Sequence, residues 1–423
     1  MKKIMLSVAA LIAMATTFAS QNRKVLIIGI DGVRSDALQQ GDVPNIDALI
    51  ASGFSTFEAW HLGITVSGPS WSTIFNGVWH QKHGVTDNSF AGSHYDNYPF
   101  YPKRAKELLP NLNAVQVNDW APLSSQVYND GYNQKIIRLA DYAAMTNAVK
   151  IQLQNPNVDV IDTHWDMPDG AGHGSGFSPS NPIYMQTIHA VDSCIGKVME
   201  ILQARPNYAN ENWLVLLITD HGGTGTSHGG NSDAERKIWW IGSGKNVIQR
   251  EITGVQDPGS YVMTGNPVNP ALVKKAPVQA DIAVTALHHL LYEKLDSAQF
   301  AAKLVEWNLD GKSWLDSIKT ADVDPPVDTP TAIANRGKDE IGIKLFPNPA
   351  TGLVSLWMET ELSAVVSYAV INVQGRVVLD EKHAKMASRN KLNIDMSSLP
   401  AGNYFIRVTA GGKQAVKQVV LIP

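Results

Sequence analysis

The sequence predicts an α/β protein with a largely parallel sheet flanked by helices, followed by a small all-β sandwich domain. Three observations support this fold class. Short apolar runs alternate with helical patterns up to about residue 320, a Pro-, Asp- and Thr-rich segment follows, and the chain ends in short strand patterns separated by turns. With 423 residues, 44% hydrophobic and 17% charged, the chain can form one large and one small domain with a sizeable core.

The large domain is assigned to residues 22–320 from its apolar runs. The predicted buried strands are "RKVLIIGIDG" (23–32), "NVDVIDTHWD" (157–166), "NWLVLLITDHGG" (212–223) and "RKIWWIGSG" (236–244). Helical patterns lie between and after them, at residues 43–53, 183–202 and 279–294. Strands that alternate with helices favour a largely parallel sheet with helices on both faces.

The start of the chain has the pattern of a secretory signal peptide, assigned to residues 1–20. Two lysines precede an apolar stretch over residues 4–18, and small residues follow it. This stretch is short for a membrane span, which needs about 20 apolar residues, and no later stretch is long enough. A buried N-terminal helix is the alternative interpretation. The signal-peptide pattern and the lack of a later long apolar stretch predict an exported protein whose mature chain has no transmembrane segment.

Charge and cysteine content narrow the function classes. The net charge of −4 indicates no general basic surface, which disfavours nucleic-acid binding. The single cysteine, Cys194, has no partner for an internal disulfide and lies in a helical pattern, where a small buried apolar role is expected. A domain of this size can rely on its core without disulfides.

The end of the chain divides into a linker, residues 321–341, and a sandwich, residues 342–423. The motifs "LFPNPATG", "NVQGRVV", "LPAGNYFIRV" and "KQVVLIP" occur in this order within the sandwich. As a set they resemble the C-terminal sorting domain of the type IX secretion system. The resemblance implies that the tail is an export address read at the outer membrane, and hence a secreted or cell-surface protein. A carbohydrate-binding or adhesive sandwich is the alternative.

Carboxylate and imidazole side chains follow the predicted strands directly. Asp31 ends the first run, Asp166 or Asp169 the second, and Asp220 with His221 the third. Ligands of parallel α/β sheets bind beyond the carboxyl ends of the strands, so these side chains are expected to meet there. They are typical oxygen and nitrogen ligands of zinc and related metals.

Each of these residues also has a structural interpretation. A strand-terminal aspartate often caps the next helix, a single histidine is more often structural, and "HGG" alone is a turn. Taken together, however, so many carboxylates and imidazoles would be costly to gather without a compensating cation. The cluster also includes His173 in "PDGAGH" and His228 in "TDHGGTGTSHGG".

An ordered set of motifs over residues 24–230 carries a second resemblance. "VLIIGIDGVRSDAL", "VPNIDALIASG", Ser67-Gly68-Pro69, "HGVTDN", "PDGAGH" and "TDHGG" resemble the alkaline phosphatase superfamily, most closely its nucleotide pyrophosphatase/phosphodiesterase branch. The resemblance implies an alkaline phosphatase-like catalytic domain over residues 22–320. It also implies two divalent metal ions, expected to be Zn²⁺, and a small-molecule phosphate ester as the substrate.

The resemblance assigns a role to each candidate site residue. One metal would be held by Asp169, His173 and His228. The other would be held by Asp31, Asp220, His221 and the Oγ of Ser67. Ser67 aligns with the nucleophile, usually Thr in this branch, and Asn88 with the residue that binds a phosphoryl oxygen. His228 is the least conventional ligand, because its counterpart lies further along the chain in several branches.

The stretch "TVSGPSWSTIFNG", residues 65–77, places no base near Ser67 in the sequence. Metal coordination lowers the pKa of a serine hydroxyl, so a metal-activated Ser67 needs no neighbouring base and would form a phosphoseryl intermediate. The alternative is that Ser67 caps the following helix. Either way, the start of a helix favours an anion.

Three other functions compete with a phosphodiesterase or nucleotide pyrophosphatase. "SGPSW" resembles the S-x-P-S-R start of the sulfatase signature, but Trp71 stands where Arg belongs. A phosphomonoesterase commonly uses an Arg or a third metal to balance the extra charge, and no Arg is near Ser67 in the sequence. Trp71 and Trp79 either stack on a substrate or belong to the helix core. A non-catalytic surface binding protein is the remaining alternative.

Overall fold

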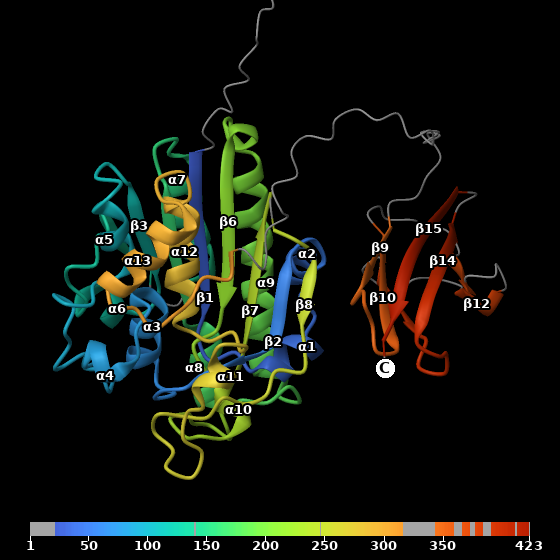
Figure 1. Ribbon diagram of the computed structural model, residues 1–423, viewed down its shortest axis with the longest axis horizontal. Helices are drawn as coiled ribbons and strands as arrows, with labels where there is room; N and C mark the ends of the chain where they lie inside the picture. The colour runs from blue at the N-terminus through green and yellow to red at the C-terminus, as the bar shows by residue number, and fades with distance from the viewer. Residues whose placement is uncertain are drawn as a thin grey trace, which may run out of the picture.

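The computed structural model describes residues 22–138, 141–245, 247–315, 343–358, 366–372, 377–383, 391–410 and 413–422. The predicted signal peptide and linker lie outside these residues. Eight strands form one sheet (Figure 1). In chain order they are β1 (Asn22–Ile30), β2 (Phe54–Trp60), β3 (Ala114–Asn118), β4 (Gln134–Ile137), β5 (Val160–Trp165), β6 (Glu211–Ile218), β7 (Lys237–Gly244) and β8 (Arg250–Ile252).

The sheet is mixed and mostly parallel, with the order β4-β3-β5-β1-β6-β7-β2-β8. The pairs β4–β3, β3–β5, β5–β1 and β1–β6 are parallel, and so is β2–β8. Only β7 runs against its neighbours β6 and β2. The predicted parallel sheet is therefore confirmed, with β7, the run predicted at residues 236–244, as its antiparallel member. The carboxyl ends of β5, β1 and β6 meet at one edge.

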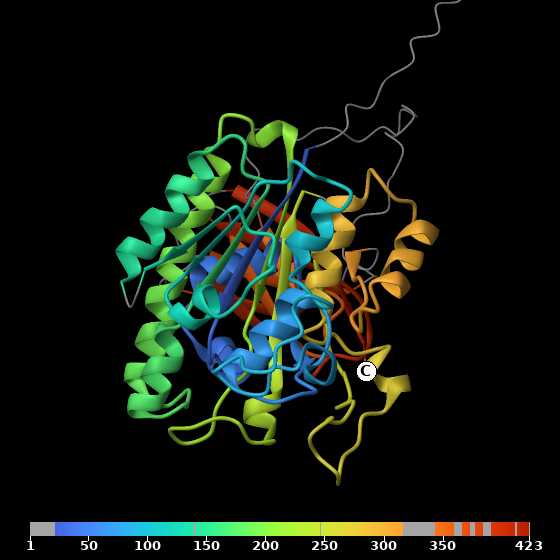
Figure 2. The same ribbon diagram turned by 90° about the vertical axis from the view of Figure 1, so that its left-hand side faces the viewer.

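Helices cover both faces of the sheet (Figure 2). They are α1 (Ser35–Gln40), α2 (Pro44–Ser52), α3 (Ser67–Asn76), α4 (His80–His83), α5 (Tyr101–Lys106), α6 (Ala121–Ser125), α7 (Tyr142–Gln154), α8 (Met167–Ser175), α9 (Pro182–Gln203), η1 (Tyr208–Asn210), α10 (Asp233–Arg236), α11 (Pro270–Val273), α12 (Asp281–Leu291) and α13 (Ser297–Glu306). The three helices predicted from the sequence correspond to α2, α9 and α12.

Alternate residues of β1 point into two separate cores. Val25 and Ile27 belong to the core that includes residues of α3 and α12, whereas Leu26 and Ile28 pack with residues of α2, α7 and α9. This period-two alternation, apolar on both sides, explains why the strand reads as a continuous apolar run. Cys194 is buried in the second core, as expected.

The C-terminal part is an antiparallel sandwich of two sheets, as predicted. The first sheet has the order β13-β10-β9 and the second β12-β11-β14-β15. These strands are β9 (Ile343–Phe346), β10 (Leu353–Met358), β11 (Val366–Asn372), β12 (Val377–His383), β13 (Lys391–Asp395), β14 (Gly402–Ala410) and β15 (Lys413–Leu421). Buried side chains from both sheets form one core between them.

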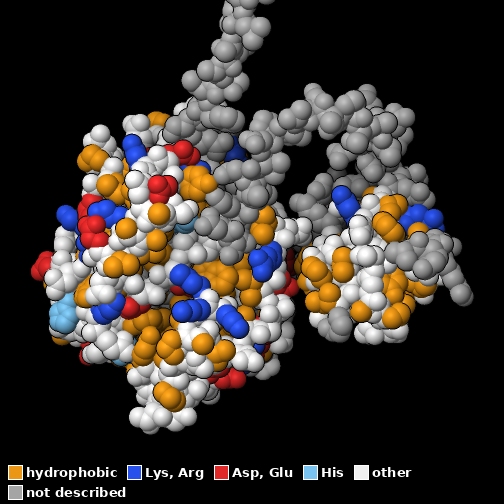
Figure 3. Space-filling view, in the orientation of Figure 1, with side chains coloured by type: hydrophobic (Ala, Val, Ile, Leu, Met, Phe, Trp, Pro, Cys, Tyr) orange, Lys and Arg blue, Asp and Glu red, His pale blue; other side chains and the backbone are white. Residues whose placement is uncertain are grey.

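The helices and one face of the surface bear on membrane and nucleic-acid partners. Among the described residues, no helix combines the length and the apolar character that crossing a membrane requires. On the face shown in Figure 3, basic and acidic side chains are interspersed.

A buried carboxyl group on β5 should give the fold a distinctive pH dependence. Asp162 accepts hydrogen bonds from Tyr101 Oη (2.7 Å) and Tyr132 Oη. Burial raises the pKa of Asp162 from 3.8 to about 7, although both tyrosine hydroxyls oppose the shift. Between these two values the folded chain keeps a proton that the unfolded chain has released, so stability should fall as the pH rises.

The substitution Asp162→Asn should remove this pH dependence, because an amide does not titrate and can still bond to both tyrosines. The free energy of unfolding of wild type, relative to the variant, should fall by roughly 3 kcal/mol between about pH 4.5 and about pH 8. Urea unfolding of both proteins at the two pH values measures this difference. A difference that stays constant with pH would show that Asp162 is ionised throughout.

Candidate metal centre

The candidate site lies at the carboxyl ends of β1, β5 and β6, near α8 and α10 in Figure 1. Asp31 follows β1, Asp220 and His221 follow β6, and α8 after β5 supplies Asp169 together with His173 one turn later. Ser67 begins α3, and Asn88 and His228 lie in loops. The parallel topology thus brings segments far apart in the chain to one edge, as the sequence indicated.

Asp31, Asp220, His221 and Ser67 form one buried group. The Nε2 atom of His221 lies 3.2 Å from Asp220 Oδ2, 3.6 Å from Asp31 Oδ1 and 3.4 Å from Ser67 Oγ. Gly32 stabilises this arrangement, because its backbone N–H donates to Asp220 Oδ1 at 3.1 Å. Gly32 has φ +66°, and a Cβ there would lie 2.6 Å from Asp169 Oδ1, so a larger residue would be strained and would also clash.

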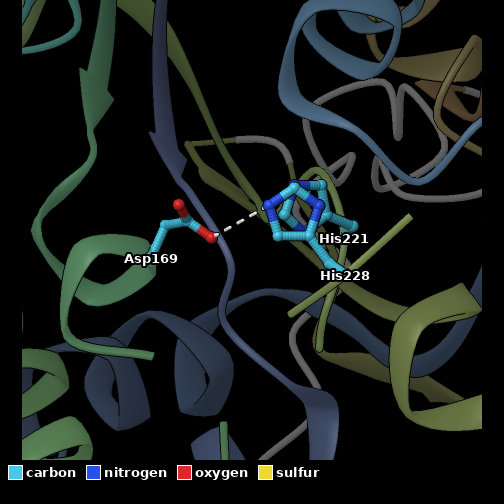
Figure 4. Close-up of side chains that lie close together, drawn as sticks. All are labelled: Asp169, His221 and His228. Carbon is cyan, nitrogen blue, oxygen red and sulfur yellow. Dashed lines mark ion pairs between the residues drawn. The ribbon is translucent and has the colours of Figure 1, made fainter. Parts of the chain in front are cut away.

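Asp169, His173 and His228 form the adjoining group. The Nε2 of His173 lies 3.3 Å from Asp169 Oδ2 and 3.0 Å from His228 Nε2, which is itself 3.6 Å from Asp169 Oδ1. Figure 4 shows Asp169 pointing towards the rings of His221 and His228, whose centroids are 3.9 Å apart. The two groups therefore form one continuous cluster, with His173 at its solvent-exposed side.

The three histidines are oriented by backbone carbonyl groups. The Nδ1 atoms of His221, His173 and His228 lie 2.8–2.9 Å from the carbonyl oxygens of Gly222, Thr226 and Thr65, respectively. A carbonyl oxygen only accepts, so each Nδ1 carries the proton, and in the neutral ring each Nε2 directs a lone pair into the cluster. Metal-binding histidines are usually held by such an outer hydrogen bond.

The carboxylate groups also have lone pairs that no hydrogen-bond donor occupies. Asp31 Oδ1, Asp169 Oδ1 and Asp220 Oδ2 are buried atoms without a hydrogen-bond partner among the described residues. Lone pairs of nitrogen and oxygen thus face one another with no donor between them, which is unfavourable unless a cation binds there. This donor set fits divalent metal ions with mixed nitrogen and oxygen ligands.

Burial and the neighbouring charges of the cluster also shift the pKa values of its carboxyl and imidazole groups. With protein groups alone, burial first and then the charges of Asp31 and Asp166 raise the pKa of Asp169 to about 9. Burial also raises the pKa of Asp220. Burial, followed by the charge of His228, lowers the pKa of His221 to about 3, which keeps its ring neutral. The neutral imidazole of His221 can bind a cation directly, and a bound cation would offset the raised pKa values of Asp169 and Asp220 by favouring their ionised forms.

Ser67 is the first residue of α3, and Val66 occupies the N-cap position without a side-chain hydrogen bond to the helix. The alternative interpretation of Ser67 as a helix cap is therefore wrong, and its hydroxyl is available to the cluster. Asn88 lies beside it, because the Gly68 backbone N–H donates to Asn88 Oδ1 at 2.8 Å. A Cβ on Gly68 would lie 2.6 Å from the Asp87 carbonyl, so the close contact requires glycine here.

The two tryptophans near Ser67 belong to the interior. Trp71 and Trp79 are 0% and 3% exposed, so neither offers a face for stacking on a substrate. Trp239 and Trp240 are buried in the sheet core, as the sequence indicated.

The sequence did not predict the contacts of four side chains around Asp31. The indole N–H of Trp71 donates to Asp31 Oδ2 at 2.8 Å, and His164 Nε2 lies 3.0 Å from the same oxygen. Asp119 Oδ1 lies 3.6 Å from His164 Nδ1, and Asp166 lies close to both Asp31 and His164. Asp166 was considered from the sequence only as an alternative to Asp169. The available signal was a histidine within the apolar run "NVDVIDTHWD", where a buried polar side chain needs a partner.

Comparison with known proteins gives two family matches. The family described as type I phosphodiesterase / nucleotide pyrophosphatase matches residues 25–122 and 116–240, together just over half of the chain. The family described as secretion system C-terminal sorting domain matches residues 344–422. Both resemblances inferred from the sequence motifs are therefore confirmed.

Individual relatives are distant. The chain is 23% identical over 246 residues to human ectonucleotide pyrophosphatase/phosphodiesterase family member 5, covering 51% of this chain and 49% of that protein. It is 25% identical over 225 residues to human bis(5'-adenosyl)-triphosphatase ENPP4, covering 48% of each. It thus spans about half the length of the curated relatives it matches. The solved structure of BT1596, a 2-O GAG sulfatase, is 12% identical with a TM-score of 0.50, covering 94% of this chain and 85% of that one, and shows the fold alone.

Proposed function

The chain belongs to the type I phosphodiesterase / nucleotide pyrophosphatase family, and from this premise we propose that it is an exported, metal-dependent hydrolase of phosphoric esters. The finer proposal is a phosphodiesterase or nucleotide pyrophosphatase that uses Ser67 as its nucleophile. One observation carries it: three imidazole lone pairs and three unpartnered carboxylate oxygens converge beside a buried serine hydroxyl.

Two divalent cations fit this donor set. We propose that Asp169, His173 and His228 hold one cation. The other would be held by Asp31, Asp220 and His221, together with Ser67 Oγ. Mixed nitrogen and oxygen ligands suit Zn²⁺ and also Mn²⁺ or Fe²⁺. When bound, such cations supply Lewis-acid stabilisation of charge and lower the pKa of the serine hydroxyl.

The side chains of the protein then have distinct tasks. Ser67 Oγ would lose its proton and attack phosphorus, forming an oxygen–phosphorus bond as the bond to the leaving oxygen breaks. The resulting phosphoseryl intermediate keeps the second ester group of the diester, and water would hydrolyse its bond to Ser67 to release a phosphate monoester. Asn88 uses its carbonyl oxygen to hold the Gly68 N–H, so its amide group is oriented to donate to a phosphoryl oxygen. The N-terminus of α3 adds a partial positive charge beside the same oxygens.

A neighbouring pocket favours a diester over a monoester. The pocket has a volume of about 540 Å³ and is lined by Asp119, Trp120, Ala121, Pro122, Asp166, Met167 and Gly170. Carboxylate atoms of Asp166 and Asp31 lie within 4.8 Å of each other, so the pocket adjoins the metal centre. Ionised Asp119 and Asp166 would repel the second negative charge of a monoester here, and burial raises the pKa of both groups, that of Asp166 to about 7. Trp120, in contrast, offers an apolar surface to an ester substituent.

A substrate panel tests this function. We expect the full chain to hydrolyse bis-p-nitrophenyl phosphate faster than p-nitrophenyl phosphate or p-nitrophenyl sulfate, and chelator to remove the activity. Preference for the monoester would keep the mechanism but identify a phosphomonoesterase. Preference for the sulfate would identify a sulfatase, and no hydrolysis of any ester by the metal-loaded protein would favour a non-catalytic binding protein.

We also propose that the type IX secretion machinery exports the chain to the cell surface or beyond. The match of residues 344–422 to a sorting domain supports this proposal. A chain that ends at residue 341 should then keep its esterase activity but remain inside the outer membrane. Cell fractionation followed by the diester assay measures this, and export of the shortened chain would contradict the proposal.

A further inference from the structure

Two buried donors meet at one oxygen of Asp31. The Trp71 indole N–H, from α3, donates to Asp31 Oδ2 at 2.8 Å, and His164 Nε2, from β5, lies 3.0 Å from the same atom. Trp71, His164 and Asp31 are all 0% exposed. The other oxygen, Oδ1, has no hydrogen-bond partner among the described residues and lies 3.6 Å from His221 Nε2.

This geometry fixes which atom donates and which oxygen stays available. An indole N–H can only donate, and Nε2 of His164 must carry a proton to bond to a carboxylate. With both donors on Oδ2, the free lone pairs of Asp31 are concentrated on Oδ1. The carboxylate therefore presents one oxygen, in one direction, to the group that contains His221 and Ser67.

Packing holds both donors in place. The rings of Trp71 and His164 meet edge to face, with centroids 4.7 Å apart and an interplanar angle of 83°. A Cβ on Gly29 of β1 would lie 2.3 Å from the Trp71 ring, so the indole can cross this strand only because residue 29 is glycine. On the far side, Asp119 Oδ1 lies 3.6 Å from His164 Nδ1 and also accepts from the Asp166 backbone N–H at 2.6 Å.

We infer that Trp71 and His164 are positioning residues of the metal centre, which hold Asp31 so that it binds a cation through Oδ1 alone. The inference rests on the proposed function, because it takes Asp31 as a metal ligand. It assigns a role to the tryptophan that stands where the sulfatase signature has arginine, because the Trp71 indole N–H donates a hydrogen bond to Asp31, a proposed metal ligand. Such outer contacts commonly determine metal affinity.

The test compares variants that keep shape but lose the donor. Trp71→Phe keeps an aromatic ring and loses the N–H, and His164→Leu loses the donor at similar volume. His164→Gln retains an amide N–H within similar reach of Asp31. For each full-length variant, zinc per chain and zinc affinity are measured by competition with a chromogenic chelator, and the melting temperature is measured in excess chelator.

We expect Trp71→Phe and His164→Leu to bind the more weakly held zinc roughly 10- to 100-fold less tightly. His164→Gln should recover most of this loss. Trp213→Phe is the matched control, because Trp213 is equally buried and its N–H donates to Glu211 at 2.8 Å, at the opposite end of the sheet. The control should lower the melting temperature without changing zinc affinity.

Three results would overturn the inference. Unchanged zinc affinity in both Trp71→Phe and His164→Leu would show that the two residues only pack in the core. If His164→Gln does not recover zinc affinity and Trp71→Phe binds zinc as tightly as wild type, the two residues do not share a hydrogen-bonding role towards Asp31. A wild-type chain that binds three cations, one of which His164→Leu loses, would make His164 a ligand itself. If wild type binds no metal at all, the proposed function fails as well, so the two failures are distinguishable.

Discussion

Replacement of Ser67 by alanine is expected to lower kcat for the diester by roughly 10³- to 10⁶-fold, as expected for loss of a covalent nucleophile. The Ser67 hydroxyl faces His221 Nε2 at 3.4 Å and makes no capping bond to α3. Its removal should therefore change the free energy of unfolding by less than about 1 kcal/mol. Because six other side chains would still hold the cations, zinc content should stay near that of wild type.

The measurement pairs steady-state kinetics with metal analysis of the same preparation. Ser72→Ala is the matched control, since Ser72 is buried on the same helix but bonds to the Gly68 carbonyl and Tyr95 Oη instead of the cluster. Ser67→Thr should retain activity, because it keeps the hydroxyl and threonine is the usual residue of the family at this position. A Ser67→Ala variant with wild-type kcat would mean that water attacks the ester directly or that the chemistry occurs elsewhere.

The sequence predicted the parts of the fold that depend on local pattern. Continuous apolar runs identify β1, β5, β6 and β7 because strands buried on both faces lack alternation with polar residues. Pro44 and Gly53 mark the two ends of α2. The direction of β7 was not predictable, because an apolar run contains no information about whether its neighbours run parallel or antiparallel to it.

The candidate site was predictable to the level of residue type and strand end. Asp31 and Asp220 follow β1 and β6, which are parallel neighbours with their carboxyl ends at the same end of the sheet, so their proximity is a consequence of topology. The contacts of Trp71 and His164 were not predictable in the same way. They depend on the distance between α3 and β5 across β1, which is set by packing around Gly29 and has no counterpart in sequence spacing.

The carbonyl groups that orient the three histidines could not be predicted from the sequence either. They belong to the backbone of Thr65, Gly222 and Thr226, where any residue type offers the same oxygen. Loop conformation alone decides whether that oxygen reaches an imidazole Nδ1. The structure therefore indicates which ring nitrogen of each histidine carries the proton, which composition and spacing do not determine.

Removal of divalent cations by chelator should abolish hydrolysis and also lower the melting temperature. A cation that binds only the folded state adds about 4 kcal/mol of stability at a thousandfold excess over its Kd. Without it, the unpartnered oxygens of Asp31, Asp169 and Asp220 and the histidine lone pairs would face one another in a buried cluster. Thermal melts with and without chelator, followed by titration of Zn²⁺ back into the sample, measure both effects.

The variant Asp220→Asn should distinguish a role of Asp220 as a metal ligand from a role in packing alone. We expect its effects on stability to have opposite signs with and without metal. In chelator we expect the variant to be more stable than wild type by roughly 1–3 kcal/mol near neutral pH. Burial and the charge of Asp31 raise the pKa of Asp220, so its ionised form is costly, whereas an amide can keep the acceptor for Gly32 N–H and donate towards His221 Nε2.

With Zn²⁺ the order should reverse, because an amide is a poor replacement for a carboxylate ligand. The variant should lose one cation per chain, most of the thermal stabilisation by zinc, and the diesterase activity. A structural carboxylate would instead make the variant less stable under both conditions. Equal zinc content in variant and wild type, or lower stability of the variant in chelator, would contradict a role of Asp220 in holding a cation.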